Sequence, residues 1–427
     1  MPLFKGLEVP AVKRRSHDGV VLRRIMVTRD TDVIQTGDSL HGRHVLLGIT
    51  GGIAAVESVK LARELRRHGA ELTVVMTPSA QRIITPLAVR WASQAEVITD
   101  WDGDLSVLNS VDAVLVAPAT RDVMASHIHG LQHGPLMMAL SVARSRTVPV
   151  LMIPSMHQDL ATDPVTDEIV EELRQQSVHV LWGPDEEGKR KTPSPRIVVA
   201  HLCHHLNKRL PKRRHVVVTL GATRSPIDDV RFVQNTSTGA TGWAIADHLH
   251  RHGHNVTCVA GLTTAVEPEW LPLVLRTPTP QAMLAECLAL ANDPIDAWIH
   301  AAAVLDYVVG QPAEGKLASQ QGPLAVELVE HEKHIQALES ACQHAVRIGF
   351  KLESGIKQND LIHRAVAQIG QANMTAVVAN RLEDIGVTGK PRGYLVDRQG
   401  AHFVLEDQAR LNDALLTLVQ RGPEGSN

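Results

Sequence analysis

Two short loops of small residues in the second half of the chain have the composition of a phosphate-binding site. An apolar strand that begins at Val216 leads into the turn 221–224, and a second loop, 235–239, precedes a helix that begins near Thr241. A helix N-terminus carries unsatisfied N–H donors and about half a positive charge, so two such loops at one crevice can hold an anion. We expect the phosphates of a nucleotide there. An ordinary turn between a strand and a helix is the alternative, because it also needs small residues.

The elements that must position these loops follow an alternating pattern. Short segments rich in Val, Leu and Ile are HVLLGIT, ELTVVMT, AVLVAPAT and VPVLMIP in the first half, and HVVVTLG, HNVTCVAG, DAWIHAAAVLDY, AVRIGF and TAVVAN in the second. Helical segments separate them, and such strands are typical of parallel sheets that are covered on both faces. The pattern predicts an α/β protein with two doubly wound, Rossmann-like domains, whose ligands bind beyond the C-terminal ends of the strands.

The same pattern suggests where the domains begin and end. We assign 1–42 to a leader of unknown structure, 43–203 to the first α/β domain, 204–214 to a basic linker, and 215–427 to the second α/β domain. The leader could add an edge strand or help the chain to oligomerise. The basic linker could instead bind nucleic acid, but one short basic run on a nearly neutral chain is usually a solvated connection.

Composition excludes several classes of protein. The 427 residues are 44% hydrophobic and 21% charged with a net charge of −3, which argues against binding nucleic acid by bulk electrostatics. Neither a signal peptide nor an apolar run of about 20 residues is present, so we expect no membrane segment. The four cysteines have no metal-ligand spacing and the histidine run 247–254 fits a helix end, so we identify no metal ligands and expect a reducing cytoplasm.

The segment 221–239, GATRSPIDDVRFVQNTSTG, resembles without a gap the signature of phosphopantothenate–cysteine ligases. These enzymes activate the carboxylate of 4′-phosphopantothenate with CTP and join the acyl-cytidylate to cysteine. The resemblance implies catalytic roles for Asn235, which matches the asparagine that binds the acyl-cytidylate, and for Lys316, which matches the flap lysine. A helix-capping asparagine and a merely exposed lysine are the alternatives.

Further motifs of the ligase extend this resemblance. Residues 300–307 resemble AAVADY, and residues 348–353 resemble GFAAET. The implied nucleotide-binding residues are Gly221, Ala222, Thr223, Ala302, Asp306, Lys316 and Phe350. Asp306 could instead cap a turn, and Phe350 could be a core aromatic. The triphosphate chemistry implies Mg²⁺ with CTP. In three places the chain departs from the family: KNPD is EHEK at 330–333, the loop GKMG is GATG at 239–242, and in the region of the lysines that follow GFAAET it has Arg364.

The first half resembles the cysteine-decarboxylating flavoproteins in four motifs, at 48–55, 76–80, 117–120 and 154–157. The resemblance implies a flavodoxin-like domain that binds FMN. Its implied FMN-binding residues are Thr50, Gly51, Gly52, Ile53, Thr77, Ser79, Pro118, Ala119 and Thr120.

The decarboxylase residues of that family are replaced. The position of the catalytic histidine holds Asp104, two asparagine positions hold His133 and His157, and no cysteine occurs near 187–190. Groups of this kind act as a unit, so their joint replacement argues against an intact decarboxylase. His133 and His157 are candidate flavin-site histidines, because imidazole can act as a base at neutral pH. Pocket histidines without a catalytic duty are the alternative.

These observations identify the chain as a member of the fused flavoprotein–ligase family of coenzyme A biosynthesis. The expected reaction is CTP-dependent ligation of 4′-phosphopantothenate to cysteine, beside an FMN domain whose decarboxylase activity is left open. The alternatives are a flavoprotein that acts on another cysteinyl substrate and a non-catalytic flavin- or nucleotide-binding subunit. The expected partners are small molecules, neither nucleic acid nor a membrane, and a homo-oligomer is implied by the resemblance.

Overall fold

The computed structural model describes residues 29–422, apart from 102–105, 107–109, 187–188 and 319–321. The chain divides into two compact units. Here the N-terminal unit means residues 29–210 together with 251–253, and the C-terminal unit means residues 211–250 and 254–422. Each unit has hydrophobic cores of its own.

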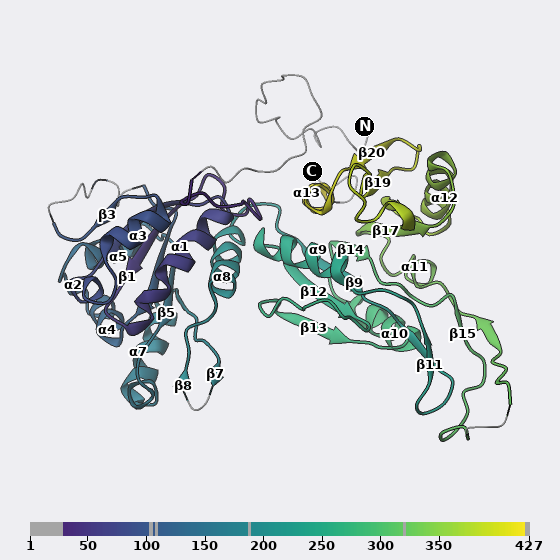
Figure 1. Ribbon diagram of the computed structural model, residues 1–427, viewed down its shortest axis with the longest axis horizontal. Coiled ribbons are helices and arrows are strands. Elements are labelled where there is room, and N and C mark those ends of the chain that lie inside the picture. Colours follow the sequence, from purple (N-terminus) through teal and green to yellow (C-terminus); the bar gives the residue numbers. More distant parts are fainter. Residues whose placement is uncertain (1–28, 102–105, 107–109, 187–188, 319–321, 423–427) are drawn as a thin grey trace. The chain divides into compact units, whose positions relative to one another are not determined.

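A six-stranded parallel sheet forms the centre of the N-terminal unit (Figure 1). Its strands are β1 His44–Ile49, β2 Glu71–Met76, β3 Val97–Ile98, β4 Ala113–Ala119, β5 Val150–Pro154 and β6 Val178–Val180, and they lie in the order β3-β2-β1-β4-β5-β6. Successive residues of a strand point to opposite faces. Leu47 therefore packs in the core on one face of the sheet, and Leu46 in the core on the other.

Helices cover both faces of this sheet. One face carries α1 Ser58–Arg67, α3 Pro86–Ser93 and α8 Pro195–Asn207, and the other carries α4 Arg121–Ile128, α5 Pro135–Ser145 and α7 Pro164–Gln175. The shorter elements are η1 Ile53–Glu57, α2 Pro78–Gln81, α6 Gln158–Ala161 and the hairpin of β7 Asp185–Glu186 and β8 Lys189–Arg190.

The C-terminal unit is built on an eight-stranded sheet in the order β13-β12-β9-β14-β17-β18-β19-β20. Its strands are β9 His215–Leu220, β12 Asn255–Ala260, β13 Leu273–Arg276, β14 Ala297–His300, β17 Val346–Glu353, β18 Ala376–Arg381, β19 Gly393–Val396 and β20 His402–Leu405. The last two run antiparallel to their neighbours, and the other six are parallel.

Five helices and two hairpins complete the described part of this unit. Helices α9 Ala240–Arg251 and α13 Gln408–Arg421 cover one face of the sheet, and α10 Pro280–Leu290, α11 His334–Ala337 and α12 Gln358–Gln371 cover the other, with the short η3 Leu382–Asp384 after β18. The hairpins are β10 Arg224–Pro226 with β11 Phe232–Gln234, and β15 Tyr307–Val309 with β16 Leu328–Glu330. None of the helices in the described residues is both long enough and apolar enough to span a bilayer.

The two units share one strand order. The first six strands of each main sheet, counted along the chain, lie in the order third, second, first, fourth, fifth, sixth, which is the doubly wound arrangement of dinucleotide-binding folds. The α/β fold predicted from the sequence is therefore confirmed. In such sheets ligands bind where the strand order reverses. That point lies between β1 and β4 in the N-terminal unit, and between β9 and β14 in the C-terminal unit.

The boundaries between regions differ in part from the prediction. Helix α8 continues through His204 to Asn207, so the first four residues assigned to the linker 204–214 are helical. These residues are mostly polar, which is typical of a linker, but His205 and Leu206 are buried in the structure. In the leader, the described residues form no strand. Thr36 N and Leu40 N instead donate to carbonyls at the end of α1.

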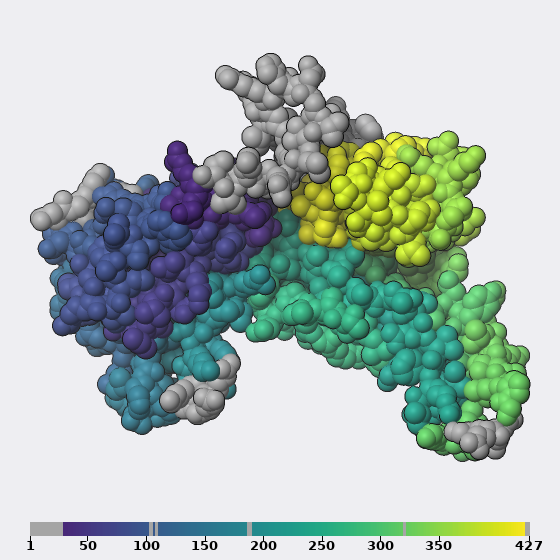
Figure 2. All heavy atoms as spheres, in the orientation of Figure 1, coloured from purple at the N-terminus to yellow at the C-terminus, as the bar shows by residue number. Residues whose placement is uncertain are grey.

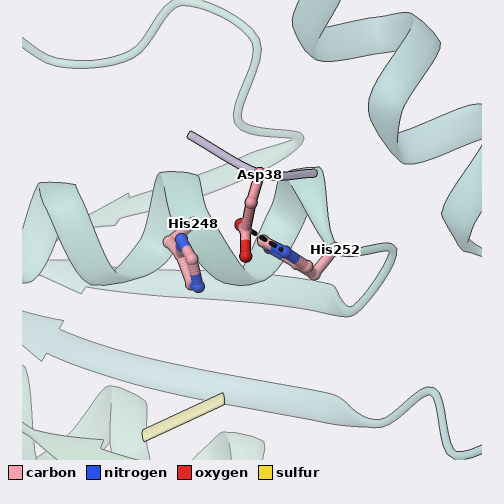
Figure 3. A group of neighbouring side chains, drawn as sticks. All are labelled: Asp38, His248 and His252. Carbon is pink, nitrogen blue, oxygen red and sulfur yellow. Dashed lines mark ion pairs between the residues drawn. The ribbon is translucent and has the colours of Figure 1, made fainter. Parts of the chain in front are cut away.

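The histidine run 247–254 lies at the C-terminal end of α9, as its composition predicts. Gly253 follows the helix with φ +86, and a Cβ there would lie 2.3 Å from the carbonyl carbon of Asn207. Figure 3 shows two of the imidazoles. His252 Nε2 lies 3.3 Å from Asp38 Oδ1, and His248 Nε2 lies 3.3 Å from Asp413 Oδ1 of α13. Each of these histidines therefore has a carboxylate partner.

A buried histidine at the end of β14 should make the C-terminal unit sensitive to acid. Burial, together with the positive charge of the neighbouring Arg347 and the nearby His334, lowers the pKa of His300 to about 3. The unfolded chain takes up this proton near pH 6.5 and the folded chain does not, so stability falls as the pH drops below about 6.5. From pH 7 to pH 5 we expect a loss of about 2 kcal/mol from this group.

The variant His300→Phe keeps a planar ring beside Trp298, on which His300 stacks at 6.1 Å, but it cannot titrate. Its loss of unfolding free energy between pH 7 and pH 5 should be about 2 kcal/mol smaller than that of the unaltered chain. Denaturant titrations read by hydrogen exchange in β14 measure this difference. Equal losses in the two proteins would contradict the prediction.

Candidate functional sites

Two glycines bring the small-residue loops of the C-terminal unit together. Gly221 and Gly239 both have φ +79. A Cβ on Gly239 would lie 3.6 Å from the Cα of Gly221, and a Cβ on either residue would meet Thr263 Cγ2 at less than 3 Å. The two loops are therefore adjacent at the end of β9, and α9 begins directly after Gly239 at Ala240. A side chain at either glycine would have no room.

The backbone of Ala303 joins three of the predicted residues. Asn235 Nδ2 and Thr223 N each donate to Ala303 O at 3.1 Å, and Ala303 N donates to Gly221 O at 2.8 Å. Thr223 Oγ1 also accepts from Leu305 N at 2.9 Å. The end of β9, the loop that carries Asn235 and the loop after β14 thus form one hydrogen-bonded unit at the point where the strand order reverses.

Three other predicted nucleotide-binding residues lie on or next to this unit. Ala222 forms β-bridges to Leu262 and Ala303, and Ala302 N donates to Thr219 Oγ1 at 3.4 Å. Asp306 follows on the same loop with an exposed side chain.

Phe350 lies on β17, one residue beyond the pair formed by Gly349 and His300 of β14. Its ring is partly buried against the core under α9 and α13. The structure therefore places Phe350 within β17, just beyond the C-terminal end of β14, with part of its ring packed in the core.

Lys316 lies in the segment between β15 and β16, and its side chain is exposed. Two backbone N–H groups of this segment donate to the hairpin that precedes Asn235. Ala313 N donates to Ile227 O at 2.9 Å, and Leu317 N donates to Asp228 Oδ2 at 3.2 Å. The two hairpins pack side by side, with Val309 N donating to Ser225 Oγ (Figures 1 and 2).

Sequence reasoning missed Asp228 and Arg392. Burial of Asp228 raises the pKa of its carboxyl, but hydrogen bonds from three backbone N–H groups and from Arg231 outweigh this and lower it to about 2. Arg392 donates to Thr241 Oγ1 at 2.7 Å in the first turn of α9, and burial lowers the pKa of Arg392. The sequence PIDDV does signal a side-chain-capped turn at Asp228. Nothing in the sequence signals a contact between residues 151 positions apart.

A cationic pocket of about 190 Å³ lies between α11 and α12. Lys333, Lys351 and Arg364 are among the residues that line it, and Glu353 pairs with Lys351 at 3.2 Å and with Arg364 at 2.6 Å. Arg364 lies in the region where the family has the lysines that follow GFAAET. The positive charge of Arg364 is therefore partly neutralised by its ion pair with Glu353.

In the N-terminal unit the predicted FMN-binding residues lie at or just beyond the C-terminal ends of three neighbouring strands, β1, β2 and β4. Thr50 Oγ1 donates to Pro118 O at 2.8 Å and accepts from Thr120 N at 3.1 Å. Ala119 O accepts from Ser155 N at 3.1 Å, which ties the end of β5 to the same place. One hydroxyl therefore fixes the relative position of two of the predicted loops.

The adjoining loop forms a cradle in which Gly51 leaves no room for a side chain. A Cβ on Gly51 would lie 2.4 Å from Ser79 Cβ, whereas one on Gly52 would lie 3.5 Å from Pro118 Cβ. Thr77 Oγ1 accepts from Ala80 N at 3.3 Å and caps α2. Backbone amides and hydroxyls without a carboxylate fit a phosphate group.

Two apolar features adjoin the cradle. The side chain of Ile53 is 78% exposed, which is unusual for an isoleucine beside a sheet edge. A pocket of about 300 Å³ lies next to Ala54 and Pro118 and is also lined by residues 192–195. The cradle therefore has an adjacent space that suits an apolar ring system.

The two candidate flavin-site histidines are exposed. His157 Nδ1 lies 3.2 Å from Asp159 Oδ2, and 71% of its side chain is accessible to solvent. His133 lies in the loop that precedes α5 and is also exposed. Asp104 and residues 187–188, where the sequence departs from the decarboxylases, lie outside the described residues.

Family models and known relatives match nearly the whole chain. A family model described as "Flavoprotein" matches residues 33–207, and one described as "DNA/pantothenate metabolism flavoprotein C-terminal domain" matches residues 211–421. The "Coenzyme A biosynthesis bifunctional protein CoaBC" of Thermococcus kodakarensis is 34% identical over 355 residues, which cover 81% of this chain and 87% of the relative. The protein of the same name from Methanocaldococcus jannaschii is 28% identical over 80% of this chain and 84% of its own length.

Among solved structures, the DNA/pantothenate metabolism flavoprotein from Streptococcus pneumoniae is 22% identical with a TM-score of 0.45, and the match covers 49% of this chain and 99% of that one. The family is given by the matched domains, which follow one another along the chain, and by the relative that is 34% identical. The chain belongs to the bifunctional coenzyme A biosynthesis proteins, in which a decarboxylase-like flavoprotein domain precedes a ligase domain.

Proposed function

We propose that the C-terminal unit joins 4′-phosphopantothenate to cysteine at the expense of CTP. The observation that carries the proposal is the convergence of Asn235, Thr223 and Gly221 on the backbone of Ala303. This arrangement leaves the N-terminus of α9 beside two glycine loops, which suits a bound triphosphate. The membership of the chain in the coenzyme A biosynthesis family supports the choice of substrates.

In the proposed reaction, a carboxylate oxygen of 4′-phosphopantothenate attacks the α-phosphorus of CTP and pyrophosphate leaves. The cysteine amine then attacks the acyl carbon of the acyl-cytidylate, CMP leaves, and the amine loses a proton to form the amide. Asn235, held by Ala303 O, would bind the acyl-cytidylate. Lys316 would balance the negative charge that grows on the phosphate oxygens, with Mg²⁺ accompanying the triphosphate.

In the N-terminal unit we propose a site for FMN. The hydroxyl of Ser79 and the amide of Gly51 would hold its phosphate, and the apolar pocket beside Pro118 would take the rings. The bonds of Thr50 to Pro118 and Thr120, and of the Gly52 amide to Thr50 O, would hold the loop in place. A bound flavin supplies two-electron oxidation chemistry. Decarboxylation of phosphopantothenoylcysteine is the second candidate activity, which the match of residues 33–207 to the flavoprotein family supports. We further propose a homo-oligomer, as the resemblance implies, which light scattering would test.

One assay tests the proposed ligase. The purified chain is supplied with CTP, 4′-phosphopantothenate and cysteine, and pyrophosphate and amide are measured while each component is left out in turn. Pyrophosphate release should require CTP and 4′-phosphopantothenate, and amide formation should require cysteine as well. ATP and UTP serve as the nucleotide controls. The absence of release with every nucleoside triphosphate would defeat the assignment.

A further inference from the structure

Asp228 lies at the centre of a group of hydrogen bonds between two segments that are distant in the sequence. Its side chain is fully buried. Oδ1 accepts from Val230 N at 2.8 Å and Arg231 N at 2.6 Å, while Oδ2 accepts from Arg231 Nη1 at 2.5 Å and Leu317 N at 3.2 Å. One oxygen of the carboxylate therefore bonds only within its own turn, and the other is shared between Arg231 of that turn and Leu317 of a remote segment.

The remote segment carries Lys316. It is attached at Ala313, whose N–H donates to Ile227 O, and at Leu317, whose N–H donates to Asp228 and whose carbonyl accepts from Arg231 Nη1 at 3.3 Å. Only residues 314–316 lie between these two attachments. Lys316 thus directly precedes a residue that is held on both its N–H and its C=O.

A turn alone does not account for this arrangement. An aspartate that caps a turn needs only the bonds of Oδ1 to the two following amides. The bond to Leu317 joins residues 89 positions apart and adds nothing to the turn. A buried carboxylate would be costly without partners, and here one of the two partners of its second oxygen belongs to the segment of Lys316.

We infer that Asp228 is a positioning residue of the ligase reaction, which fixes Lys316 through Leu317 relative to the phosphates bound beside Asn235. The inference rests on the proposed function. Asp228 does not touch the nucleotide in this account. It keeps the ammonium group within reach of the place where negative charge develops, and a shift of about 1 Å in such a group can cost on the order of 100-fold in rate.

The variant Asp228→Asn separates the two uses of the carboxylate. Its remaining oxygen can still accept the two turn bonds, but its amide nitrogen cannot accept from Leu317 N or Arg231 Nη1. Asp397→Asn is a matched control. Asp397 is also buried in the C-terminal unit and also caps a turn, accepting from Gln399 N at 3.0 Å and Ala401 N at 2.9 Å, far from Lys316 in the sequence.

A double-mutant cycle on the full chain tests the coupling. Asp228→Asn should lower kcat/KM for pyrophosphate release by about 10- to 100-fold, mostly in kcat, and Asp397→Asn should leave it within about 2-fold. In a chain that already carries Lys316→Gln, adding Asp228→Asn should cost less than about 2-fold. If the double variant is still active and the losses of the two single variants multiply in it, the inference is wrong.

Hydrogen exchange gives a second reading that does not depend on activity. The amide of Leu317 should exchange at least about 10-fold faster in Asp228→Asn, while the amides of β9 stay protected and report an intact fold. Unchanged exchange at Leu317 would also overturn the inference. Asp228→Ser, which removes the same acceptor, replaces the asparagine variant if exchange in β9 shows that its sheet is disturbed. A wild-type chain that releases no pyrophosphate with any nucleotide would instead defeat the proposed function.

Discussion

Asn235→Ala should abolish amide formation, with a loss of at least about 10²- to 10³-fold in kcat. A fixed donor or acceptor at a reacting centre is worth that much, because it meets the developing charge without reorganising. Asn235 is fixed by its bond to Ala303 O, and its removal leaves that carbonyl with Thr223 N as a donor. The fold should therefore lose only about 1 kcal/mol of stability.

A matched control exists in the same unit. Asn412 Nδ2 donates to Ala244 O at 3.3 Å on α9, so Asn412→Ala removes a similar bond without touching the proposed site. Both variants should unfold at similar denaturant concentrations, while only Asn235→Ala should lose amide formation. Measuring pyrophosphate and amide separately tells whether the first or the second chemical step has failed. Wild-type amide formation by Asn235→Ala would contradict the role.

Both units use a threonine hydroxyl in the same way at the point where the strand order reverses. In the N-terminal unit Thr50 Oγ1 accepts from Thr120 N, beyond β4. In the C-terminal unit Thr223 Oγ1 accepts from Leu305 N, beyond β14. The loops beyond two parallel strands have backbone groups that no neighbouring strand can satisfy. One hydroxyl satisfies such a group and so fixes the gap between the loops, whose glycines leave space for a ligand.

The sequence predicted the parts of both sites that depend on local pattern. Apolar segments of strand length between helices dictate a doubly wound sheet, and that topology brings the loops after β9 and β14 to one edge whatever lies between them. The small residues at 221–223 and 51–52 signal a close approach of backbone, which the structure contains at Gly221 and Gly51.

What the sequence could not provide depends on contacts between distant residues. The pairing of Asp228 with Leu317, and of Arg392 with Thr241, is set by how loops return to the sheet edge. The end of α8 was misjudged for a related reason. The residues 204–207 look like a linker by composition, but the helix buries His205 and Leu206 against its own unit. Burial of a polar residue is decided by packing and not by its type.

Gly51→Ala should yield a chain that purifies without flavin and binds added FMN at least about 100-fold more weakly, a loss of about 2.7 kcal/mol. The new Cβ would lie 2.4 Å from Ser79 Cβ, while carbon atoms pack at about 3.5–4.0 Å, so the two loops must part by more than about 1 Å. Because the proposed phosphate ligands lie on these loops, their separation removes several hydrogen bonds at once. The neighbouring carbon is a Cβ and not the tip of a flexible side chain, so a rotamer change cannot relieve the contact.

The two units carry separate cores, so pyrophosphate release by the C-terminal unit should stay within about 2-fold in Gly51→Ala and serves as an internal control for folding. Gly370→Ala controls for the substitution itself, since a Cβ there meets no atom within 4 Å. The flavin absorbance per chain and the FMN dissociation constant are the measurements. Stoichiometric flavin at wild-type affinity in Gly51→Ala would mean that the cradle at Thr50–Ile53 does not hold the phosphate, and the flavin would then have to bind elsewhere on the N-terminal unit.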